Sequence, residues 1–372
     1  MARERYQRAR LRAMRWIYAL AMAAAVAGCA RVAPVADAPA RPNAENSAAE
    51  PAEAKAREVQ PPQPEAPSDT VLGEGLTSAD LAAAEVHALS VYGDRWPRIA
   101  ERSRYVRAAM REVFAKLQAP EDLFAVPVVE SAYEPYALSP SGALGLWQLM
   151  PGTARVLGLR KTRGFDPRRA VVPSTDAALR YLLALKARFG FWPLALAAYH
   201  MGPGALARSL RRHPWTPADG LDALPAPEIT REYVRLIVGL AQAMHEGALV
   251  FPEPIPMRSV WLRPPVDLVQ WTEAAGVDPL VLFRTNPGLE WTRYWDRPLA
   301  LRVPADAYAQ LQAALDQARP RMAFVRVERG DTLWRIARRA GVPVRLLRKL
   351  NPGVDPVHLR PGMRIRAPRF AR

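Results

Sequence analysis

The distribution of proline constrains this chain more than any other feature of its sequence. Of the 372 residues, 37 are proline, and many of them gather in residues 30–75 and again in residues 251–265. Proline lacks the backbone N–H that helices and central strands need, so such clusters predict linkers. They divide the chain into an N-terminal part, a long central segment and a smaller C-terminal part, and the chain length also suggests two or three domains.

The first thirty residues have the pattern of an export signal. Six arginines precede Trp16, and an apolar run from Trp16 to Ala27 follows, too short to cross a bilayer as a settled helix. Val26-Ala27-Gly28-Cys29 resembles a bacterial lipobox, in which the cysteine is lipidated; a soluble protein whose signal ends near a cysteine is the alternative. We expect a signal peptide over residues 1–28, a lipid on Cys29 and a tether over residues 29–75. Because no aspartate follows Cys29, the resemblance favours the periplasmic side of the outer membrane.

Composition excludes several kinds of site. With one cysteine, the chain cannot form an internal disulfide or a cysteine-based zinc site. The five histidines include no pair at i,i+4 spacing, so we expect no metal and no cofactor. The net charge of +16 suits an anionic partner such as nucleic acid, acidic lipid or a wall polymer. The export signal and the lack of an aromatic–basic recognition pattern argue against nucleic acid.

Helical periodicity begins near Ser78 and continues with breaks to about Leu249, which predicts an all-α domain over residues 76–250. Within it, Glu130 follows the almost wholly apolar residues 123–129. A carboxyl at the edge of such a face loses water, which raises its pKa and keeps it protonated near neutrality, as a general acid requires. The alternative is a helix-end glutamate that reaches bulk water.

Three further stretches combine flexible backbone with hydrogen-bonding side chains. Glycines let the backbone approach a ligand closely, and a glutamine amide both donates and accepts hydrogen bonds. A Gly-Pro-Gly turn stops one helix, and a Thr-Arg-Glu-Tyr sequence opens another. The residues concerned are Gly142, Gly145 and Gln148 in residues 139–154, Tyr199 and His200 in residues 197–204, and Tyr233 in residues 229–234.

In order, the four stretches closely resemble the motifs of the soluble-type lytic transglycosylase domain, over about residues 80–250. The family's Ala-Tyr-Asn-Ala-Gly-Pro-Gly motif has His200 and Met201 here, and Ile229 stands where the family often has glutamate. The resemblance implies a mostly α, lysozyme-like catalytic domain with Glu130 as the catalytic acid/base. It also implies a set of substrate-binding residues: Ser131, Gln148, Tyr199, His200 and Tyr233.

The resemblance further implies a carbon–oxygen lyase that cuts peptidoglycan glycan strands without water. Glu130 would protonate the β-1,4 bridge between N-acetylmuramic acid and N-acetylglucosamine, and then accept a proton from the C6 hydroxyl as a 1,6-anhydro ring closes. Two alternatives stay open. A lysozyme-type hydrolase uses a second carboxylate, and a weakened peptidoglycan-binding scaffold could follow from His200. The second-carboxylate candidates are Glu112, Asp122, Glu134 and Asp166.

The C-terminal part contains two segments that echo each other, residues 276–288 and 341–353. Each precedes a short alternating strand that ends in proline, so we expect a repeated β–helix–helix–β unit. The second copy resembles a LysM module over residues 321–370, whereas residues 251–320 form a linker with a degenerate LysM-like repeat. The expected sugar edge consists of Asp331, Thr332, Pro352 and Gly353.

The expected partners follow from this domain order. We expect a monomer that binds peptidoglycan glycan strands and is held to the membrane through its N-terminal lipid, without nucleic acid. Residues 321–372 contain 14 Arg and Lys against 3 Asp and Glu, a net charge of +11. Such a basic module can add a salt-sensitive attraction to anionic wall polymers or lipopolysaccharide.

Overall fold

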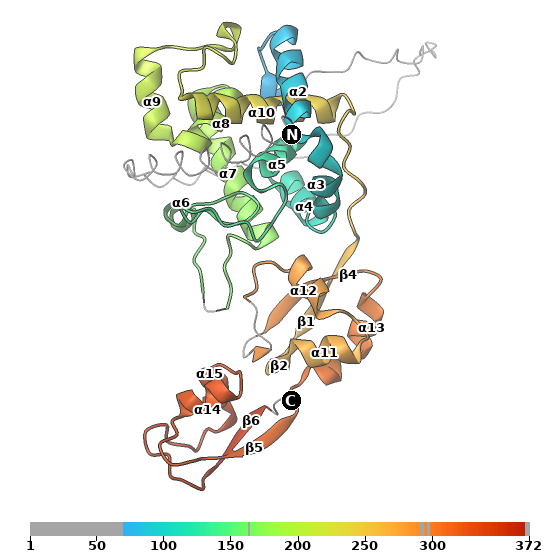
Figure 1. Cartoon of the computed structure of the whole chain (residues 1–372), viewed down its shortest axis with the longest axis vertical. Helices are drawn as coiled ribbons and strands as arrows, with labels where there is room; N and C mark the ends of the chain where they lie inside the picture. Colours follow the sequence, from blue (N-terminus) through green and yellow to red (C-terminus); the bar gives the residue numbers. More distant parts are fainter. Residues whose placement is uncertain (1–69, 163, 291–293, 296–297, 369–372) are drawn as a thin grey trace, which may run out of the picture.

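The computed structural model describes residues 70–162, 164–290, 294–295 and 298–368. The predicted signal peptide, Cys29 and nearly all of the tether lie outside these residues. Within the described part, hydrophobic side chains form three separate cores that follow one another along the long axis of the molecule (Figure 1). No helix in this part has the length and apolarity to cross a bilayer.

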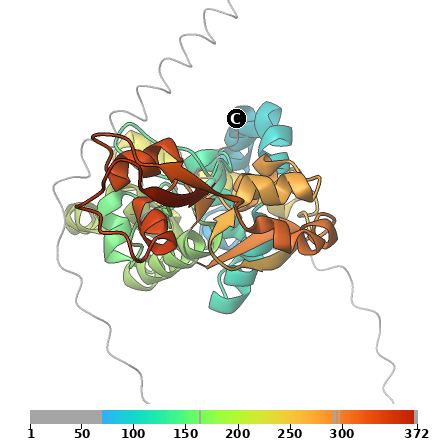
Figure 2. The same ribbon diagram turned by 90° about the horizontal axis from the view of Figure 1, so that it is seen from below.

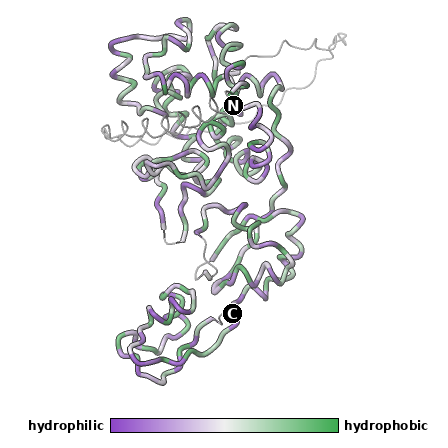
Figure 3. The backbone as a smooth tube through the Cα atoms, in the orientation of Figure 1, coloured by the Kyte–Doolittle hydropathy of each residue, from purple (hydrophilic) through white to green (hydrophobic). Residues whose placement is uncertain are grey.

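The first core belongs to a helical domain, as predicted. Both hydrophobic and hydrophilic residues occur along its helices (Figure 3), as in helices that place one face in a core. Its α-helices are α2 (Ser78–Tyr92), α3 (Trp96–Ser103), α4 (Arg107–Leu117), α5 (Ala125–Ser131), α6 (Pro151–Val156), α7 (Val171–Phe189), α8 (Trp192–Met201), α9 (Pro203–Arg212) and α10 (Glu228–His245). Its 3-10 helices are η2 (Val71–Gly73), η3 (Gly93–Arg95), η4 (Glu121–Phe124) and η5 (Pro217–Asp219).

Helix α10 packs closely on α2 at Gly239. A Cβ at this position would lie 2.0 Å from the carbonyl oxygen of Ala84 on α2, so any larger residue would separate the two helices. The neighbouring side chains Ile237, Val238 and Ala241 are fully or almost fully buried. Gly239 therefore lets α10 run through the centre of the domain.

Helix α5 is short and nearly all of it is buried. Residues 125–129 lie in the core, and the helix ends because Ala132 and Tyr133 adopt left-handed backbone angles, with φ of 50° and 58°. The Tyr133 hydroxyl donates to the carbonyl of Phe124 at 3.0 Å, which closes the turn. Glu130 is thereby placed at the end of a buried helix, at the border of the core.

The second and third cores belong to two units that share a strand, two helices and a closing strand, to which the first unit adds further elements. The first unit contains β1 (Met257–Leu262), β2 (Val266–Asp267), α11 (Leu268–Ala274), α12 (Pro279–Thr285), β3 (Tyr294–Trp295), β4 (Leu299–Pro304), α13 (Tyr308–Ala313) and η6 (Leu315–Ala318). The second contains β5 (Met322–Arg326), α14 (Leu333–Arg339), α15 (Val344–Leu350) and β6 (Arg364–Pro368). In both, the first and last strands pair antiparallel around two helices.

One asparagine makes the same hydrogen bonds in each unit. The Asn286 amide donates to Leu282 at 2.8 Å and to the carbonyl of Arg302 at 2.7 Å, and its oxygen accepts from the Arg302 N–H at 2.8 Å. The corresponding bonds of Asn351, to Leu347 and Arg366, measure 2.8, 2.7 and 2.7 Å. Asn286 therefore corresponds to Asn351, and Arg302 to Arg366.

The first unit docks on the helical domain through the turn that follows Asn286. The Gly288 carbonyl accepts from the Asp166 N–H at 2.9 Å, and the Glu290 N–H donates to the Gly164 carbonyl at 2.8 Å. A Cβ on Gly288 would lie 2.6 Å from the Ala170 Cβ, whereas nothing lies within 4 Å of a Cβ on the equivalent Gly353. In the first unit this turn therefore contacts the helical domain, whereas the equivalent turn of the second unit has free space around Gly353.

This contrast predicts different effects of one substitution at equivalent positions. Gly288→Ala should destabilise the folded chain by about 1–3 kcal/mol, because the added methyl group overpacks the interface. Gly353→Ala is the matched control and should change stability by less than about 0.5 kcal/mol. Urea unfolding of the full chain measures both, and equal effects would show that the Gly288 contact does not contribute.

Candidate active site

Glu130 is half-buried, and one hydrogen bond holds its carboxyl group. The Tyr233 hydroxyl, from α10, donates to Glu130 Oε1 at 2.7 Å. Burial raises the pKa of Glu130 to about 7, while the bond from Tyr233 acts in the opposite direction. Near neutral pH this carboxyl is therefore present in both protonation states, so it can release a proton and take one back.

His200 supports Tyr233 from the end of α8. The two rings stack with centroids 4.5 Å apart and planes inclined by 28°. His200 Nδ1 lies 3.0 Å from the hydroxyl of Thr230, which is buried on the first turn of α10. Burial lowers the pKa of His200 to about 4, so the ring is neutral at neutral pH. His200 is thus placed to restrain the tyrosine that contacts Glu130.

Tyr199 and Ser131 hold the loop that carries Gln148. The Tyr199 hydroxyl donates to the Trp147 carbonyl at 2.8 Å, and the Ser131 hydroxyl lies 3.0 Å from the Leu146 carbonyl. Burial, together with the charge of Glu130, raises the pKa of Tyr199 well above its ordinary value. Both hydroxyl protons are directed to backbone, so the structure gives these residues a role in holding the loop.

Gln148 presents its carbonyl oxygen while its amide nitrogen is engaged. The nitrogen donates to Ala137 at 3.0 Å and to Gly145 at 2.9 Å, and the residue has a φ of 43°. The described contacts include no hydrogen bond to Gln148 Oε1. Gly145 has a φ of 86°, and its Cβ would lie 2.1 Å from the Arg168 carbonyl, so glycine is required there. The loop can therefore offer Gln148 Oε1 as an acceptor for a hydroxyl group.

A second carboxylate does not join Glu130 in the described residues. No other acidic group contributes to the pKa shift of Glu130. The four candidates have partners elsewhere: Glu112 with Arg302, Asp122 with Thr70 and Val71, Glu134 with Arg102 and the Tyr136 N–H, and Asp166 with Arg168. The arrangement therefore supplies one carboxyl group that both donates and accepts a proton.

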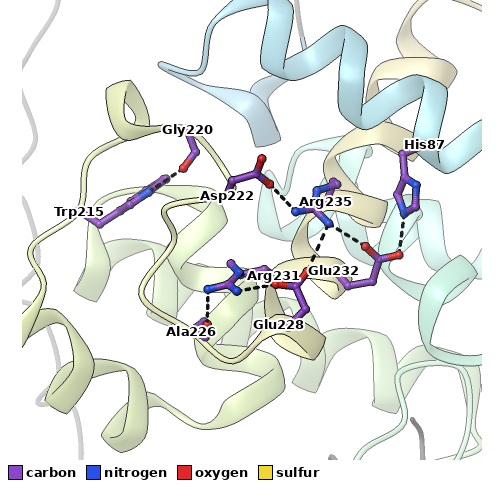
Figure 4. A network of polar contacts seen from close by, with 9 residues as sticks. All are labelled: His87, Trp215, Gly220, Asp222, Ala226, Glu228, Arg231, Glu232 and Arg235. Atoms are coloured by element: carbon purple, nitrogen blue, oxygen red, sulfur yellow. Dashed lines mark hydrogen bonds and ion pairs between the residues drawn. The ribbon is translucent and has the colours of Figure 1, made fainter.

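A network of ion pairs fixes the helix that carries Thr230 and Tyr233 (Figure 4). Glu232 lies 2.6 Å from His87 on α2 and 2.8 Å from Arg235, which in turn lies 2.5 Å from Asp222. Arg231 joins Glu228 and the Ala226 carbonyl. Sequence reasoning placed Arg231 and Glu232 in the stretch that opens a helix, but it gave no residue of this network a role. The charges at i,i+3 spacing on α10 were a usable signal, but nothing in the sequence pointed to His87 or Asp222.

Two of the four residues expected at the sugar edge of the C-terminal unit accept hydrogen bonds from nearby backbone N–H groups. Asp331 accepts from the Glu328 N–H at 3.0 Å and pairs with Arg339 at 2.7 Å, and Thr332 caps α14 through the Arg335 N–H at 3.2 Å. Pro352 and Gly353 are both exposed. The structure thus places the four residues in two turns, one at each end of the helical pair.

Two family models match this chain. The model of the transglycosylase SLT domain matches residues 114–220, which include Glu130, Gln148 and Tyr199, and the LysM model matches residues 325–368. Residues 114–220 form a transglycosylase SLT domain. A LysM domain follows at residues 325–368. The SLT match ends before α10, so Tyr233 and Thr230 reach the SLT domain's candidate site from outside the matched segment.

The chain is similar to named transglycosylases. It is 31% identical over 262 residues to "Membrane-bound lytic murein transglycosylase D" of Escherichia coli (strain K12), a match that covers 63% of this chain and 57% of that protein. The chain therefore spans somewhat more than half the length of this relative.

Two solved structures also match parts of the chain. Lytic transglycosylase Slt from Pseudomonas aeruginosa matches with 28% identity, a TM-score of 0.33, and coverage of 40% of this chain and 25% of that one. The 70 kDa soluble lytic transglycosylase of Escherichia coli matches with 22% identity, a TM-score of 0.34, and coverage of 45% and 30%.

The raised pKa of Glu130 predicts a pH-dependent stability. A carboxyl whose pKa is higher in the folded than in the unfolded state costs stability as pH rises from about 4.5 to about 7. Glu130→Gln cannot ionise, so above pH 7 it should be more stable than the wild type, on the order of 1–3 kcal/mol, with little difference below pH 4.

Urea unfolding at pH 4 and pH 8 measures this difference. The exposed Glu253→Gln is the control and should stay within about 0.5 kcal/mol of the wild type at both values. A Glu130→Gln variant that gains nothing at pH 8 would contradict the burial of this carboxyl.

Proposed function

We propose that this protein is a peptidoglycan lytic transglycosylase that cleaves the β-1,4 bond between N-acetylmuramic acid and N-acetylglucosamine. The observation that carries the proposal is the single half-buried carboxyl of Glu130, with a pKa near 7, inside a transglycosylase SLT domain. The similarity to a murein transglycosylase supports this assignment of substrate.

In the proposed reaction, Glu130 acts first as acid and then as base. Its proton passes to the bridging oxygen as the bond from C1 to that oxygen breaks, and the 2-acetamido group stabilises the positive charge at C1. The C6 hydroxyl then adds to C1 and returns its proton to Glu130. A 1,6-anhydro end forms, and no water is consumed.

Other site residues support this chemistry without proton transfer. Gln148 Oε1 is placed to accept a hydrogen bond from a sugar hydroxyl, since its amide nitrogen is already bound. Ser131 and Tyr199 hold the loop, and His200 restrains Tyr233. Each of these proposed roles rests on the contacts described above.

The two alternatives receive less support. A hydrolase of the lysozyme type needs a second carboxylate beside the bond, and the four candidates in the described residues are paired elsewhere. A peptidoglycan-binding scaffold without catalytic activity would be expected if His200 broke the hydrogen bond between Tyr233 and Glu130. Instead, His200 stacks on Tyr233 and leaves the bond from Tyr233 to Glu130 in place.

The domain order supports a role at the cell wall. We propose the boundaries expected from the sequence, with the catalytic part over residues 76–250, the linker with its LysM-like repeat over 251–320 and the LysM part over 321–370. The LysM match supports binding of peptidoglycan strands, with Asp331, Thr332, Pro352 and Gly353 as the proposed sugar edge. A monomer in the periplasm, anchored to the outer membrane through a lipid on Cys29, completes the proposal.

Digestion of purified sacculi tests the reaction. The wild type should release muropeptides that are lighter, by one water, than hydrolysed ones, because the C6 hydroxyl replaces water. Glu130→Gln should lose about a hundredfold or more of this activity, since the variant cannot transfer the proton. Mass spectrometry of the products measures both.

Glu134→Gln provides the matched control, because Glu134 is the acidic residue nearest to Glu130 in the sequence and should not be needed. Hydrolysed ends from the wild type, or loss of activity in Glu134→Gln alone, would favour the hydrolase. Full activity in Glu130→Gln would remove this residue from its proposed role.

Tyr233→Phe tests the hydrogen bond to Glu130. That bond holds the pKa of Glu130 lower than burial alone would, so its loss should raise the pKa. The acid form then persists to higher pH, and the alkaline limb of the kcat/KM profile should move upward. Tyr136→Phe, whose hydroxyl donates to the Phe283 carbonyl instead, should leave the limb in place. A limb that moves equally in both variants would contradict the assignment.

A further inference from the structure

The LysM domain has one sheet face that packs on its core and one that is open. Strands β5 and β6 pair antiparallel, with Val325 opposite Ile365 on the core side. The other face carries an exposed Phe324 and three exposed arginines, Arg326, Arg364 and Arg366. We call this set of four residues the arginine face. The domain lies at the lower end of the molecule, nearest the viewer in Figure 2.

The arginine face places like charges directly opposite each other. Arg326 pairs across the sheet with Arg364, and Arg366 pairs with Phe324. Like charges at directly opposed positions destabilise a sheet. Within the part of the chain that the structure describes, none of these three arginines forms an ion pair with a carboxylate. The face therefore has unbalanced positive charge that an anionic ligand would neutralise.

Phe324 holds one of these arginines in place. The Arg364 guanidinium lies 4.2 Å from the centre of the Phe324 ring, which is 60% exposed. A guanidinium stacked on an aromatic ring keeps its N–H groups in one plane, and that geometry suits a carboxylate or phosphate. The stacking thus orients a donor group before any ligand binds.

The unit before the LysM domain shows what the equivalent arginine binds. Arg302 corresponds to Arg366, because Asn286 and Asn351 make the same backbone bonds to them. Arg302 holds the carboxylate of Glu112 on α4 through both of its terminal nitrogens, at 2.5 and 3.3 Å. The arginine at this position in the first unit, Arg302, therefore binds a carboxylate. The corresponding Arg366 in the LysM domain has no carboxylate partner among the described residues.

We infer that the arginine face binds the free carboxylates of the peptide stems of peptidoglycan, separately from the sugar edge of the LysM domain. This inference rests on the proposed function. Arginine and carboxylate form paired, charge-assisted hydrogen bonds, and the peptide stems repeat along the strand that the LysM domain is proposed to hold. A membrane fits less well, since interfacial binding needs a wide apolar surface and this face has a single exposed ring, with Arg364 stacked on it.

Cosedimentation of the full chain with two polymers tests the inference: intact sacculi, and glycan strands freed of their peptides. The variant replaces Arg326, Arg364 and Arg366 with Gln. Its affinity for intact sacculi at low salt should fall about tenfold or more, and the loss should shrink at high salt. Its affinity for peptide-free strands should equal that of the wild type.

Matched controls separate charge, folding and geometry. Replacing the exposed Arg95, Arg98 and Arg212 of the helical domain with Gln removes the same charge and should leave affinity for sacculi unchanged. The arginine-face variant should unfold no earlier than the wild type, because it relieves the repulsion between Arg326 and Arg364. A triple Arg→Lys variant should bind at an intermediate level, since lysine keeps the charge but not the paired hydrogen bonds.

The inference would be overturned by an equal loss of affinity for both polymers, or by no loss of affinity for intact sacculi. In the second case, binding of the wild type to anionic phospholipid vesicles through these arginines would identify a membrane as the ligand instead. Anhydro products are measured in the same samples. Their absence in the wild type would overturn the proposed function, whereas normal products with an unchanged affinity would overturn only the carboxylate site.

Discussion

The hydrogen bond between Tyr233 and Glu130 is the contact on which the candidate active site depends. It joins residues 103 positions apart, at the end of a buried helix and on the helix that crosses the domain. Burial raises the pKa of Glu130, and the hydrogen bond from Tyr233 lowers it. A pKa near neutrality results from the two together, and a group that must both give and accept a proton requires such a value.

Tyr233 reaches Glu130 because α10 is held on several sides. Gly239 allows it to lie against the backbone of α2, and Glu232 pairs with His87 of that helix. The contact between Glu232 and His87 is part-buried. Close packing at Gly239, this contact and the ion pairs of Arg235 together hold α10 in position. His200 then completes the support of the Tyr233 ring.

The two C-terminal units share one arrangement of strands and helices, but their equivalent residues make different contacts. The turn at Gly288 docks on the helical domain, and Arg302 binds its Glu112. The equivalent turn at Gly353 and the equivalent Arg366 have no such neighbour among the described residues. Sequence comparison of the two units detects the common plan, because turns and strand patterns repeat, but it does not tell which surfaces face another domain.

The sequence by itself determined the helical class of the central domain and the repeat, because periodicity and turns are local patterns. The prediction of Glu130 as the catalytic residue needed the resemblance of the four stretches to a known domain as well as the apolar run beside its carboxyl. Only the tertiary structure decided what the side chains touch. Ser131 and Tyr199 were predicted to contact sugar, and in the structure their hydroxyl groups donate to the backbone of residues 146–147, while His200 stacks on Tyr233. Backbone carbonyls look alike in every sequence, and contacts between distant residues arise only when helices pack, so no local pattern could reveal them.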